Sequence, residues 1–538
     1  MTPVLEENVS QRAHHYQSYC KCDKDFRAHF DPFSLLFKEP QQPRARSGHW
    51  RLAFFLLFAQ LETLNAGRCV TSTIIPIINV MLAQRVFIFE RDNLMQKVKS
   101  MATFRDEYDH VFSLLQQHHK WFQESIPLIA SENVPSPAVR EAIVTDFGNR
   151  YAEGWPGERV YAGCRFIDQV EFKCIELMKR LFNAEFVDVR PISGVVANLA
   201  VYTAFAEPGD TLLALSIPSG GHITSGKKEL GGTAGAVKGL NVEYLPLDYK
   251  ELNIDVDKAK SKIQELAAKG KPPKFVMFGA SVFPFPHPVK ELAEAVHSVN
   301  ATIGYDAAHV AGLIAGGQFQ DPLREGADVV SLSTHKTFFG PQHGGILSWE
   351  KYAEKIKKAT FPGMVSNHHL HAVAGLTIAC AEMLEFGKEY AGQIVKNAKA
   401  LAQALHERGL NVLAEHKGFT QSHVILIDIT KHGDGGTIEE TLEKANVIIN
   451  RNLLPWDIKE GRHFMHPGGI RMGVSEVTRL GMKPPEMAEI AEFVKRVIID
   501  KEPVEKVKTD VTEFRRDYQK VHYCFENATE AYKYIKIR

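Results

Sequence analysis

The chain has 538 residues, 44% of them hydrophobic and 24% charged, which suits a globular protein of two or more domains. Lysine plus arginine equals aspartate plus glutamate, at 64 each, so the global charge argues neither for nor against nucleic acid, and we expect no nucleic-acid partner. The seven cysteines are scattered and form no CxxC pair. A disulfide framework is therefore not indicated, and a reducing cytoplasm is the expected location.

Residues 1–100 differ in composition from the rest of the chain. Two apolar stretches, 52–66 and 70–89, are interrupted by polar residues, so neither gives the run of about 20 apolar residues that a membrane span needs. Acidic Glu6 and Glu7 precede any apolar core, which argues against a signal peptide. We favour translation that begins at Met101, with the preceding residues forming no domain. A poorly ordered extension and a membrane anchor are the alternatives, and no membrane partner is expected.

From residue 101 the sequence becomes regular. An amphipathic helix is predicted over 104–122, and a Gly/Pro loop then carries Tyr151, Glu153 and Tyr161. The pattern of apolar residues next predicts a helix over 167–182 and a strand over 187–192.

Ser193 and Gly194 open an apolar helix predicted over 195–205, with the serine at its N-cap. The free backbone N–H groups of such a helix start can bind an anion, although a cap alone is the commoner role of Ser-Gly. Further strands are predicted at 211–216, at 275–278, up to Asp306 and at 329–332, alternating with helices at 256–268 and 289–299. Alternation from about 187 to 347 predicts a mostly parallel sheet covered by helices on both faces.

Two of these strands end in chemically active residues. The strand 329–332 is followed by His335 and Lys336, and the strand ending in Asp306 is followed by His309. Because ligands bind at the carboxyl ends of parallel strands, we expect Lys336 and Asp306 to hold one cofactor, pyridoxal phosphate (PLP). The lysine supplies the amine for a Schiff base, and the aspartate partners the pyridinium nitrogen. Taken singly, Asp306 could equally cap a helix, and His309 is more often a structural histidine.

The C-terminal part has strands and helices of its own. Its predicted elements are helices at 369–410, 438–445, 485–501 and 504–518 and strands at 423–429 and 470–474. We therefore expect three parts: an extension, 1–100, a PLP-binding large domain with its N-terminal arm, 101–385, and a smaller C-terminal α/β domain, 386–538.

Arg471 lies inside an apolar run, where a lone guanidinium needs an anion. A substrate carboxylate is one candidate, and a structural ion pair is the alternative. The group His368, His369 and His371 lacks a usual metal-ligand spacing, so no metal site is expected. The combination indicates a PLP enzyme that acts on amino acids. It comprises an anion site at a helix start, a lysine for a Schiff base, an acid for the pyridinium nitrogen and an arginine for a carboxylate.

Seven motifs stand out: Leu128-Ile-Ala-Ser-Glu-Asn133, Tyr151-Ala-Glu-Gly154, Tyr305-Asp-Ala-Ala-His-Val-Ala-Gly312, Ser333-Thr-His-Lys-Thr337, Phe361-Pro-Gly363, Asn450-Arg-Asn452 and Gly469-Ile-Arg-Met-Gly473. Together they resemble serine hydroxymethyltransferase, a family of fold-type-I PLP enzymes. Three further segments look most like its archaeal branch: Phe283-Pro-Phe-Pro-His-Pro288, Phe338-Phe-Gly-Pro-Gln342 and Leu454-Pro-Trp-Asp457. The resemblance runs from about residue 101 to the C-terminus. It implies an α/β fold with an aspartate aminotransferase-like large domain and a smaller C-terminal domain.

The resemblance also implies a role for each matching residue. The implied catalytic residues are Lys336, which carries the cofactor, Asp306 at its ring nitrogen, Glu153 as acid/base, and His309. The other implied cofactor contacts are Ser193 and Gly194 at the phosphate, with His222, Ser281, Ser333, His335 and Gly363. The implied substrate contacts are Ser131 and Arg471 at the carboxylate, Tyr151, Glu153 and Tyr161 from the neighbouring subunit of a homodimer, and Asn452 at the pterin.

Three positions depart from the family pattern. Ser219 stands where the family usually has a histidine stacked on the cofactor ring, so either His222 substitutes or the stacking is lost. Gln342 replaces an arginine, and 364–367 replaces a glycine-rich phosphate contact.

The expected reaction is reversible transfer of the serine hydroxymethyl carbon to a reduced pterin, which gives glycine and the methylene-pterin. The pterin is tetrahydrofolate or a methanopterin-type carrier. One alternative is a pterin-independent aldolase acting on threonine-like amino acids. Another is a non-catalytic scaffold, which the presence of Lys336, Asp306 and Arg471 argues against.

Overall fold

The computed structural model describes residues 103–526 and 529–538, so the predictions for 1–100 lie outside the described residues. From Asp106 onward the chain forms one unit. Its first helix, α4 (Phe104–Glu124), confirms the helix predicted there. One described helix, α13 (Leu370–Glu407), is long and apolar enough to cross a membrane, but 56% of its most apolar window is buried, so it is a core helix.

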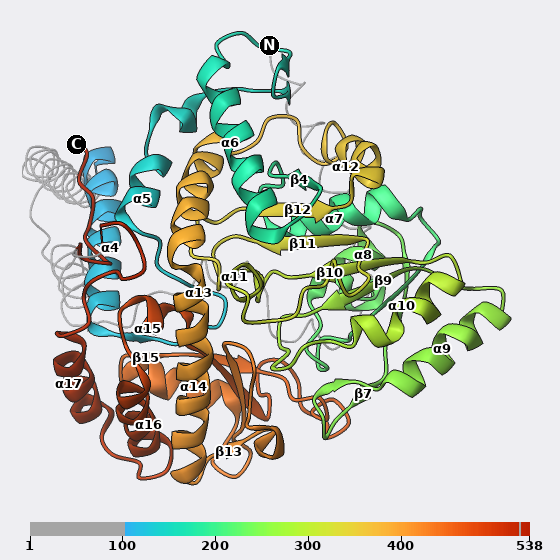
Figure 1. The fold of residues 1–538 in the computed structure, drawn as a ribbon. Coiled ribbons are helices and arrows are strands. Elements are labelled where there is room, and N and C mark those ends of the chain that lie inside the picture. The colour runs from blue at the N-terminus through green and yellow to red at the C-terminus, as the bar shows by residue number, and fades with distance from the viewer. Residues whose placement is uncertain (1–102, 527–528) are drawn as a thin grey trace, which may run out of the picture. The chain divides into compact units, whose positions relative to one another are not determined.

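A seven-stranded sheet lies at the centre, in the order β4-β12-β11-β10-β9-β5-β6 (Figure 1). The strands are β4 (Phe186–Asp188), β5 (Thr211–Ala214), β6 (Asn241–Tyr244), β9 (Pro273–Gly279), β10 (Thr302–Asp306), β11 (Val329–Ser333) and β12 (Gly344–Ser348). Neighbours from β6 to β11 pair in parallel, whereas β12 is antiparallel to both β11 and β4. The predicted mostly parallel sheet is confirmed, with one reversed strand that the sequence pattern did not reveal.

The strand predicted over 187–192 is shorter in the structure and ends at Asp188. The Asp188 side chain accepts a hydrogen bond from the backbone N–H of Arg190 at 3.0 Å. The regular ladder with β12 ends there, although the Gly344 N–H at the start of β12 still donates to the Pro191 carbonyl at 3.0 Å.

Helices cover both faces of the sheet, as predicted. Side chains alternate along each strand, so Val276 and Phe278 of β9 pack on one face and Phe275 and Met277 on the other. The first face carries α6 (Arg165–Phe182), α9 (Val256–Ala268), α10 (Val289–Ser298), α11 (Ala311–Ala315) and α13. The second carries α7 (Gly194–Phe205), α8 (Thr233–Ala236) and α12 (Ala353–Thr360). Burial on both faces explains why these strands read as unbroken apolar runs.

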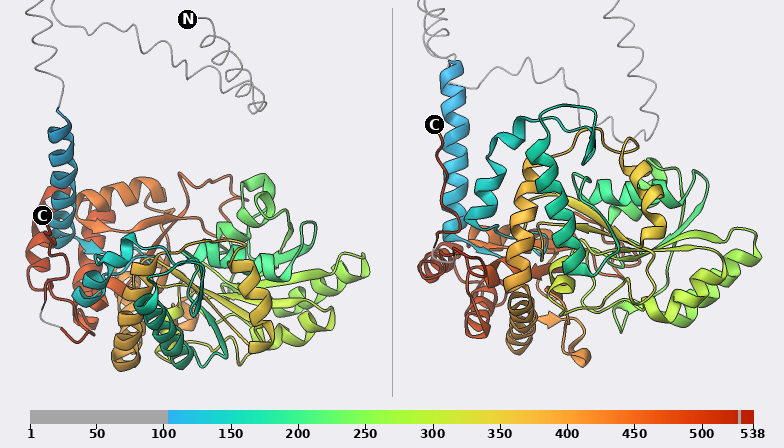
Figure 2. Two further views of the ribbon diagram at one scale, coloured as in Figure 1. Left: turned by 90° about the horizontal axis from the view of Figure 1, so that it is seen from above. Right: turned by 45° about the horizontal axis from the view of Figure 1, so that its top comes forward.

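A second, antiparallel sheet has the order β13-β14-β17-β16. It comprises β13 (Asn411–Val412), β14 (Val424–Asp428), β16 (Asn450–Asn452) and β17 (Gly469–Gly473), accompanied by α14 (Gly435–Lys444), α16 (Pro484–Ile498) and α17 (Val504–Arg515). Figure 2 shows this part, in orange and red, gathered at one side of the large sheet.

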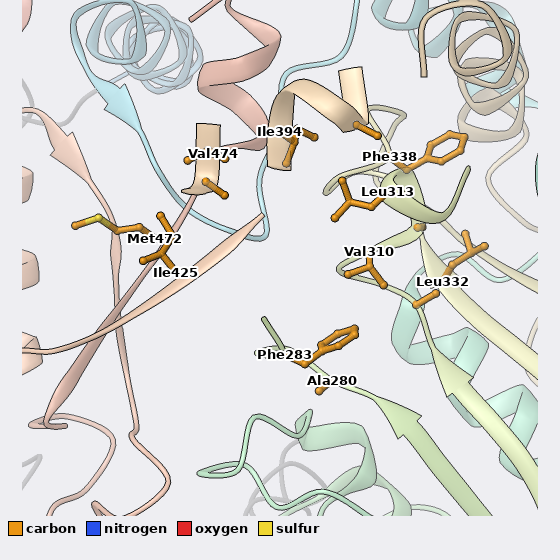
Figure 3. Packing of buried hydrophobic residues seen from close by; sticks show 14 of the residues in the cluster. Ala280, Phe283, Val310, Leu313, Leu332, Phe338, Ile394, Ile425, Met472 and Val474 are labelled. Atoms are coloured by element: carbon orange, nitrogen blue, oxygen red, sulfur yellow. The ribbon is translucent and has the colours of Figure 1, made fainter. Parts of the chain in front are cut away.

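Both sheets share one buried apolar cluster, part of which Figure 3 shows. Ile425 and Met472 come from the small sheet, Leu332 from the large sheet, and Ile394 from α13. Helix α13 therefore joins the two parts and runs without a break through residue 385, where the sequence suggested a boundary.

Candidate active site

The carboxyl edge of the large sheet gathers the predicted chemical groups. Asp306 is the last residue of β10, and Ser333 is the last residue of the neighbouring parallel strand β11. Lys336 follows in the loop between β11 and β12, and Ser281 follows β9. Neighbouring parallel strands end at the same edge of a sheet, so this placement agrees with the strand-end argument.

Lys336 lies in an environment that favours a nucleophilic amine. Burial lowers its pKa to about 8, a lowering that Asp306 opposes and Arg471 reinforces. Part of such an amine is unprotonated near neutral pH and can attack a carbonyl carbon. The Asn133 side chain donates to the Lys336 carbonyl at 2.6 Å and to the Tyr390 hydroxyl at 2.8 Å, which anchors the lysine backbone.

Asp306 is oriented by hydrogen-bond donors. Asn198 of α7 donates to its carboxylate at 2.8 Å, and the backbone N–H of Ala308 donates at 3.0 Å. Asn198 also donates to Thr224 at 2.9 Å and accepts from the Ser331 hydroxyl. The carboxylate is thereby fixed at the strand end, in the manner suited to facing a ring N–H.

Two predicted histidines lie beside these groups. Burial lowers the pKa of His222, and the charges of Lys336 and Arg471 lower it further while Asp306 opposes them. Burial also holds the pKa of His309 well below its usual value. His309 Nδ1 lies 3.4 Å from Nε2 of His423, and that Nε2 lies 3.0 Å from the Ala130 carbonyl. Both His222 and His309 are therefore neutral at neutral pH.

The start of α7 has the features of a phosphate cradle. The Ser193 hydroxyl accepts from the Val196 N–H at 3.3 Å, which confirms the predicted N-cap. A Cβ on Gly194 would lie 2.4 Å from Ser333 Oγ, so a side chain would close this space. His335 Nδ1 is buried and has no hydrogen-bond partner among residues 103–526 and 529–538. A phosphorylated cofactor fits these groups, and an aldehyde and a ring nitrogen fit Lys336 and Asp306.

Arg471 of β17 is 9% exposed, and burial lowers its pKa to about 10. Its Nε donates to Asn450 Oδ1 at 2.9 Å, and its Nη1 donates to the Ser281 carbonyl at 3.1 Å. In the part of the chain that the structure describes, no carboxylate forms an ion pair with it. Ser131 lines a cavity of about 400 Å³ together with His335.

Four predicted residues form a separate group, and among the described residues no hydrogen bond or ion pair joins them to Lys336. Tyr151, Glu153 and Tyr161 flank a hairpin of β2 (Gly154–Trp155) and β3 (Glu158–Arg159), and Gly363 follows Pro362. The rings of Tyr151 and Tyr161 lie 4.8 Å apart, and both side chains are nearly half exposed. The Tyr151 hydroxyl lies 3.3 Å from that of Ser366, which links the hairpin to the segment carrying Gly363.

Asn452, the last predicted residue, ends β16. Its side chain donates to the Leu453 carbonyl at 2.7 Å and lines a small cavity together with Ser219. Ser219 itself accepts from the Ser216 hydroxyl at 2.8 Å.

A buried charge cluster anchors the hairpin. Glu171 of α6 lies 2.6 Å from Arg159 and 3.6 Å from Arg190, and Arg159 also pairs with Asp168 at 2.7 Å. His368 Nε2 lies 3.1 Å from Glu171, and burial lowers the pKa of His368. The hydrogen bond and charge of His368, together with the charges of Arg190 and Arg159, act on the Glu171 carboxylate. Burial raises the pKa of Glu171, but these partners outweigh burial and lower it to about 2.

The histidine group that includes His368 forms no metal site in the structure. Within 103–526 and 529–538 no three histidine, cysteine or acidic side chains are placed to bind a metal ion.

Sequence comparisons identify close relatives. The family model described as serine hydroxymethyltransferase matches residues 104–494. The chain is 61% identical over 434 residues to the serine hydroxymethyltransferase of Nitrosopumilus maritimus, a match that covers 81% of this chain and 99% of the relative. It is 56% identical over 424 residues to that of Methanocaldococcus jannaschii, which covers 78% of this chain and 96% of the relative.

Proposed function

The chain belongs to the serine hydroxymethyltransferase family, and from that premise we propose how its own residues perform the reaction. This reaction moves the hydroxymethyl carbon of serine reversibly to a reduced pterin and leaves glycine. PLP, the family's cofactor, supplies an aldehyde that accepts the substrate amine and a ring that accepts electrons.

Lys336 would hold the cofactor aldehyde, Asp306 the proton on the ring nitrogen, and the start of α7 the phosphate. The observation that carries this assignment is that Lys336 and Asp306 share one buried site, where the acid opposes the lowering of the lysine pKa to about 8. A lysine that loses its proton readily can also pass one to and from the substrate's α-carbon.

Arg471 and Ser131 would bind the substrate carboxylate. Arg471 is buried, its charge meets no carboxylate among the described residues, and one of its hydrogen bonds goes to Ser281 beside the cofactor site. A buried guanidinium of this kind suits a carboxylate ligand.

The hairpin residues Tyr151, Glu153 and Tyr161 would complete the site of a second copy in a homodimer. Among the described residues of their own chain they form no hydrogen bond or ion pair with Lys336, and the two tyrosines are nearly half exposed. Helix α4 buries none of its residues within this chain, which agrees with a partner subunit that covers part of it. In that position Glu153 would take the proton from the serine hydroxyl as the carbon leaves.

We also propose that the pterin contacts Asn452, that residues 101–385 and 386–538 act as large and small domains, and that the protein works in the cytoplasm. The described cysteines, all buried and unpaired, suit a reducing compartment. Serine cleavage assayed with tetrahydrofolate and with a methanopterin-type carrier identifies the physiological carrier. Cleavage that needs neither would favour a pterin-independent aldolase.

The Lys336→Ala variant tests the central assignment. Borohydride reduction of the loaded wild-type protein should fix the cofactor covalently, which mass spectrometry detects, and the variant should remain unlabelled. Labelling of the variant at another lysine would refute the role of Lys336.

Mixing two inactive variants tests the dimer. Lys336→Ala and Glu153→Gln proteins, unfolded together and refolded, should form some dimers with one intact site and regain part of the activity. No recovery, in mixtures shown to contain mixed dimers, would place Glu153 in its own chain's site or outside catalysis.

A further inference from the structure

Asn450 lies directly opposite Arg471 on the neighbouring antiparallel strands β16 and β17. Its Oδ1 accepts from Arg471 Nε at 2.9 Å, and its Nδ2 donates to the Arg451 carbonyl at 2.6 Å. Turning the amide over would set its oxygen against a carbonyl and its N–H group against the guanidinium. The orientation of Asn450 is therefore determined by both partners.

The contacts of Arg471 determine which of its edges a ligand can use. A guanidinium grips a carboxylate with two parallel N–H bonds, either through Nε and Nη2 or through Nη1 and Nη2. Asn450 occupies Nε, which closes the first edge. The Ser281 carbonyl accepts one of the two Nη1 hydrogens. A carboxylate bound by two bonds must therefore use the outer edge, Nη1 and Nη2.

We infer that Asn450 is a positioning residue that sets the specificity of the site for a carboxylate, because it holds Arg471 with its outer edge directed at the ligand. This inference rests on the proposed function, in which Arg471 binds the substrate carboxylate. The family resemblance assigns a role to Asn452, two residues further on, whereas the Asn452 side chain donates to the Leu453 carbonyl instead. Asn450 is thus the asparagine of this strand that bonds to the arginine.

Removal of Asn450 should weaken the binding of carboxylate ligands specifically. Without its acceptor the guanidinium can rotate, so part of the binding free energy is spent on ordering it. We expect Asn450→Ala to weaken glycine binding about tenfold, raise KM for serine, and leave kcat near the wild-type value. Asn450→Asp should weaken glycine binding further, on the order of a hundredfold, because the new carboxylate pairs with Arg471 itself.

The experiment is calorimetric titration of the cofactor-loaded protein with glycine. Methylamine, which lacks the carboxylate, is titrated in parallel by the change in cofactor absorbance. Asn411→Ala is the matched control, because Asn411 lies on the far edge strand of the same sheet and bonds to Asp428 at 3.3 Å on the surface. Glycine affinity should fall in both Asn450 variants and not in the control, whereas methylamine affinity should be the same in all.

Unchanged glycine affinity in both Asn450 variants would overturn the inference, and so would an equal loss of methylamine affinity, which would show a merely structural role. The Arg471→Lys variant tests the carboxylate role of Arg471 separately from the positioning role of Asn450. If it binds glycine as the wild type does, the carboxylate role of Arg471 in the proposed function fails. If it binds glycine weakly while the Asn450 variants bind normally, only the inference about Asn450 fails.

Discussion

Replacement of Glu171 by glutamine should destabilise the fold by about 3 kcal/mol. The folded-state pKa of Glu171 is about 2, against an ordinary value of 4.5, and this difference corresponds to about 3 kcal/mol of stabilisation at neutral pH. Loss of one partner from a buried ion pair, which leaves a charge without compensation, costs about 3–5 kcal/mol. The value from the pKa shift and the value from the loss of a buried partner agree. Glutamine is the suitable replacement because it keeps the shape of the side chain and removes its charge.

The pH dependence of the stability difference provides a second, independent test of the role of Glu171. Because the folded-state pKa of Glu171 is depressed, its contribution is present above pH 4.5 and is lost as the pH falls toward 2. Glutamine does not titrate, so the stability difference between wild type and variant should shrink as the pH falls from 4.5 toward 2.

Urea unfolding followed by tryptophan fluorescence measures this difference, since Trp155 lies 4.3 Å below the Arg190 guanidinium beside Glu171. Glu176→Gln is the control. Glu176 lies on the same helix but pairs with Lys173 at the surface, where solvent screens the pair, so its loss should change the stability little. Equal losses in the two variants, or a Glu171 effect that does not change with pH, would refute the reasoning.

Three further predictions concern single side chains. Gly194→Ala should weaken PLP binding to the apoprotein by at least about tenfold, measured by equilibrium dialysis, because the added Cβ would lie 2.4 Å from Ser333 Oγ. Unchanged affinity would contradict a phosphate site at the start of α7. Burial raises the pKa of Glu476 to about 7, so wild type should lose up to about 3 kcal/mol as the pH rises from 4.5 past 7, while Glu476→Gln should not. Thermal unfolding at pH 5 and pH 8 tests this, and parallel losses would contradict it. Arg479→Met should cost about 3–5 kcal/mol in urea unfolding, because it leaves the fully buried Glu382 without its partner at 3.1 Å; a double variant that also carries Glu382→Leu should recover most of the loss, and no recovery would argue against the pair.

Much of the fold could be predicted because its signals are local. Helix α9 was predicted over 256–268 and occupies those residues, with Asp255 as N-cap accepting from the Lys258 N–H at 3.1 Å. The reversed strand β12 was not identified, because its residues begin with two glycines and its direction depends on partners elsewhere in the chain. Local composition does not encode which strand lies beside which.

In the candidate site, too, the residues with local signals could be predicted and those that depend on distant partners could not. Asp306 and Lys336 could be found because one ends an apolar strand and the other closely follows one, where sheet geometry gathers functional groups. Their supporting residues were missed, because each acts through a contact that is distant in sequence. Asn198, for example, lies 108 residues from the Asp306 carboxylate to which it donates. A signal did exist, since Asn198 is a polar residue inside the apolar helix predicted over 195–205.

Helix α13 makes the two halves of the enzyme unsuitable for exchange as modules. Its 38 residues pack against the large sheet at one end and continue without interruption toward the small sheet. One residue inserted near its middle would rotate everything downstream by about 100° and advance it by about 1.5 Å. Recombination between homologues that cross over within 370–407 therefore has to preserve helical phase, whereas a crossover in a loop has no such requirement.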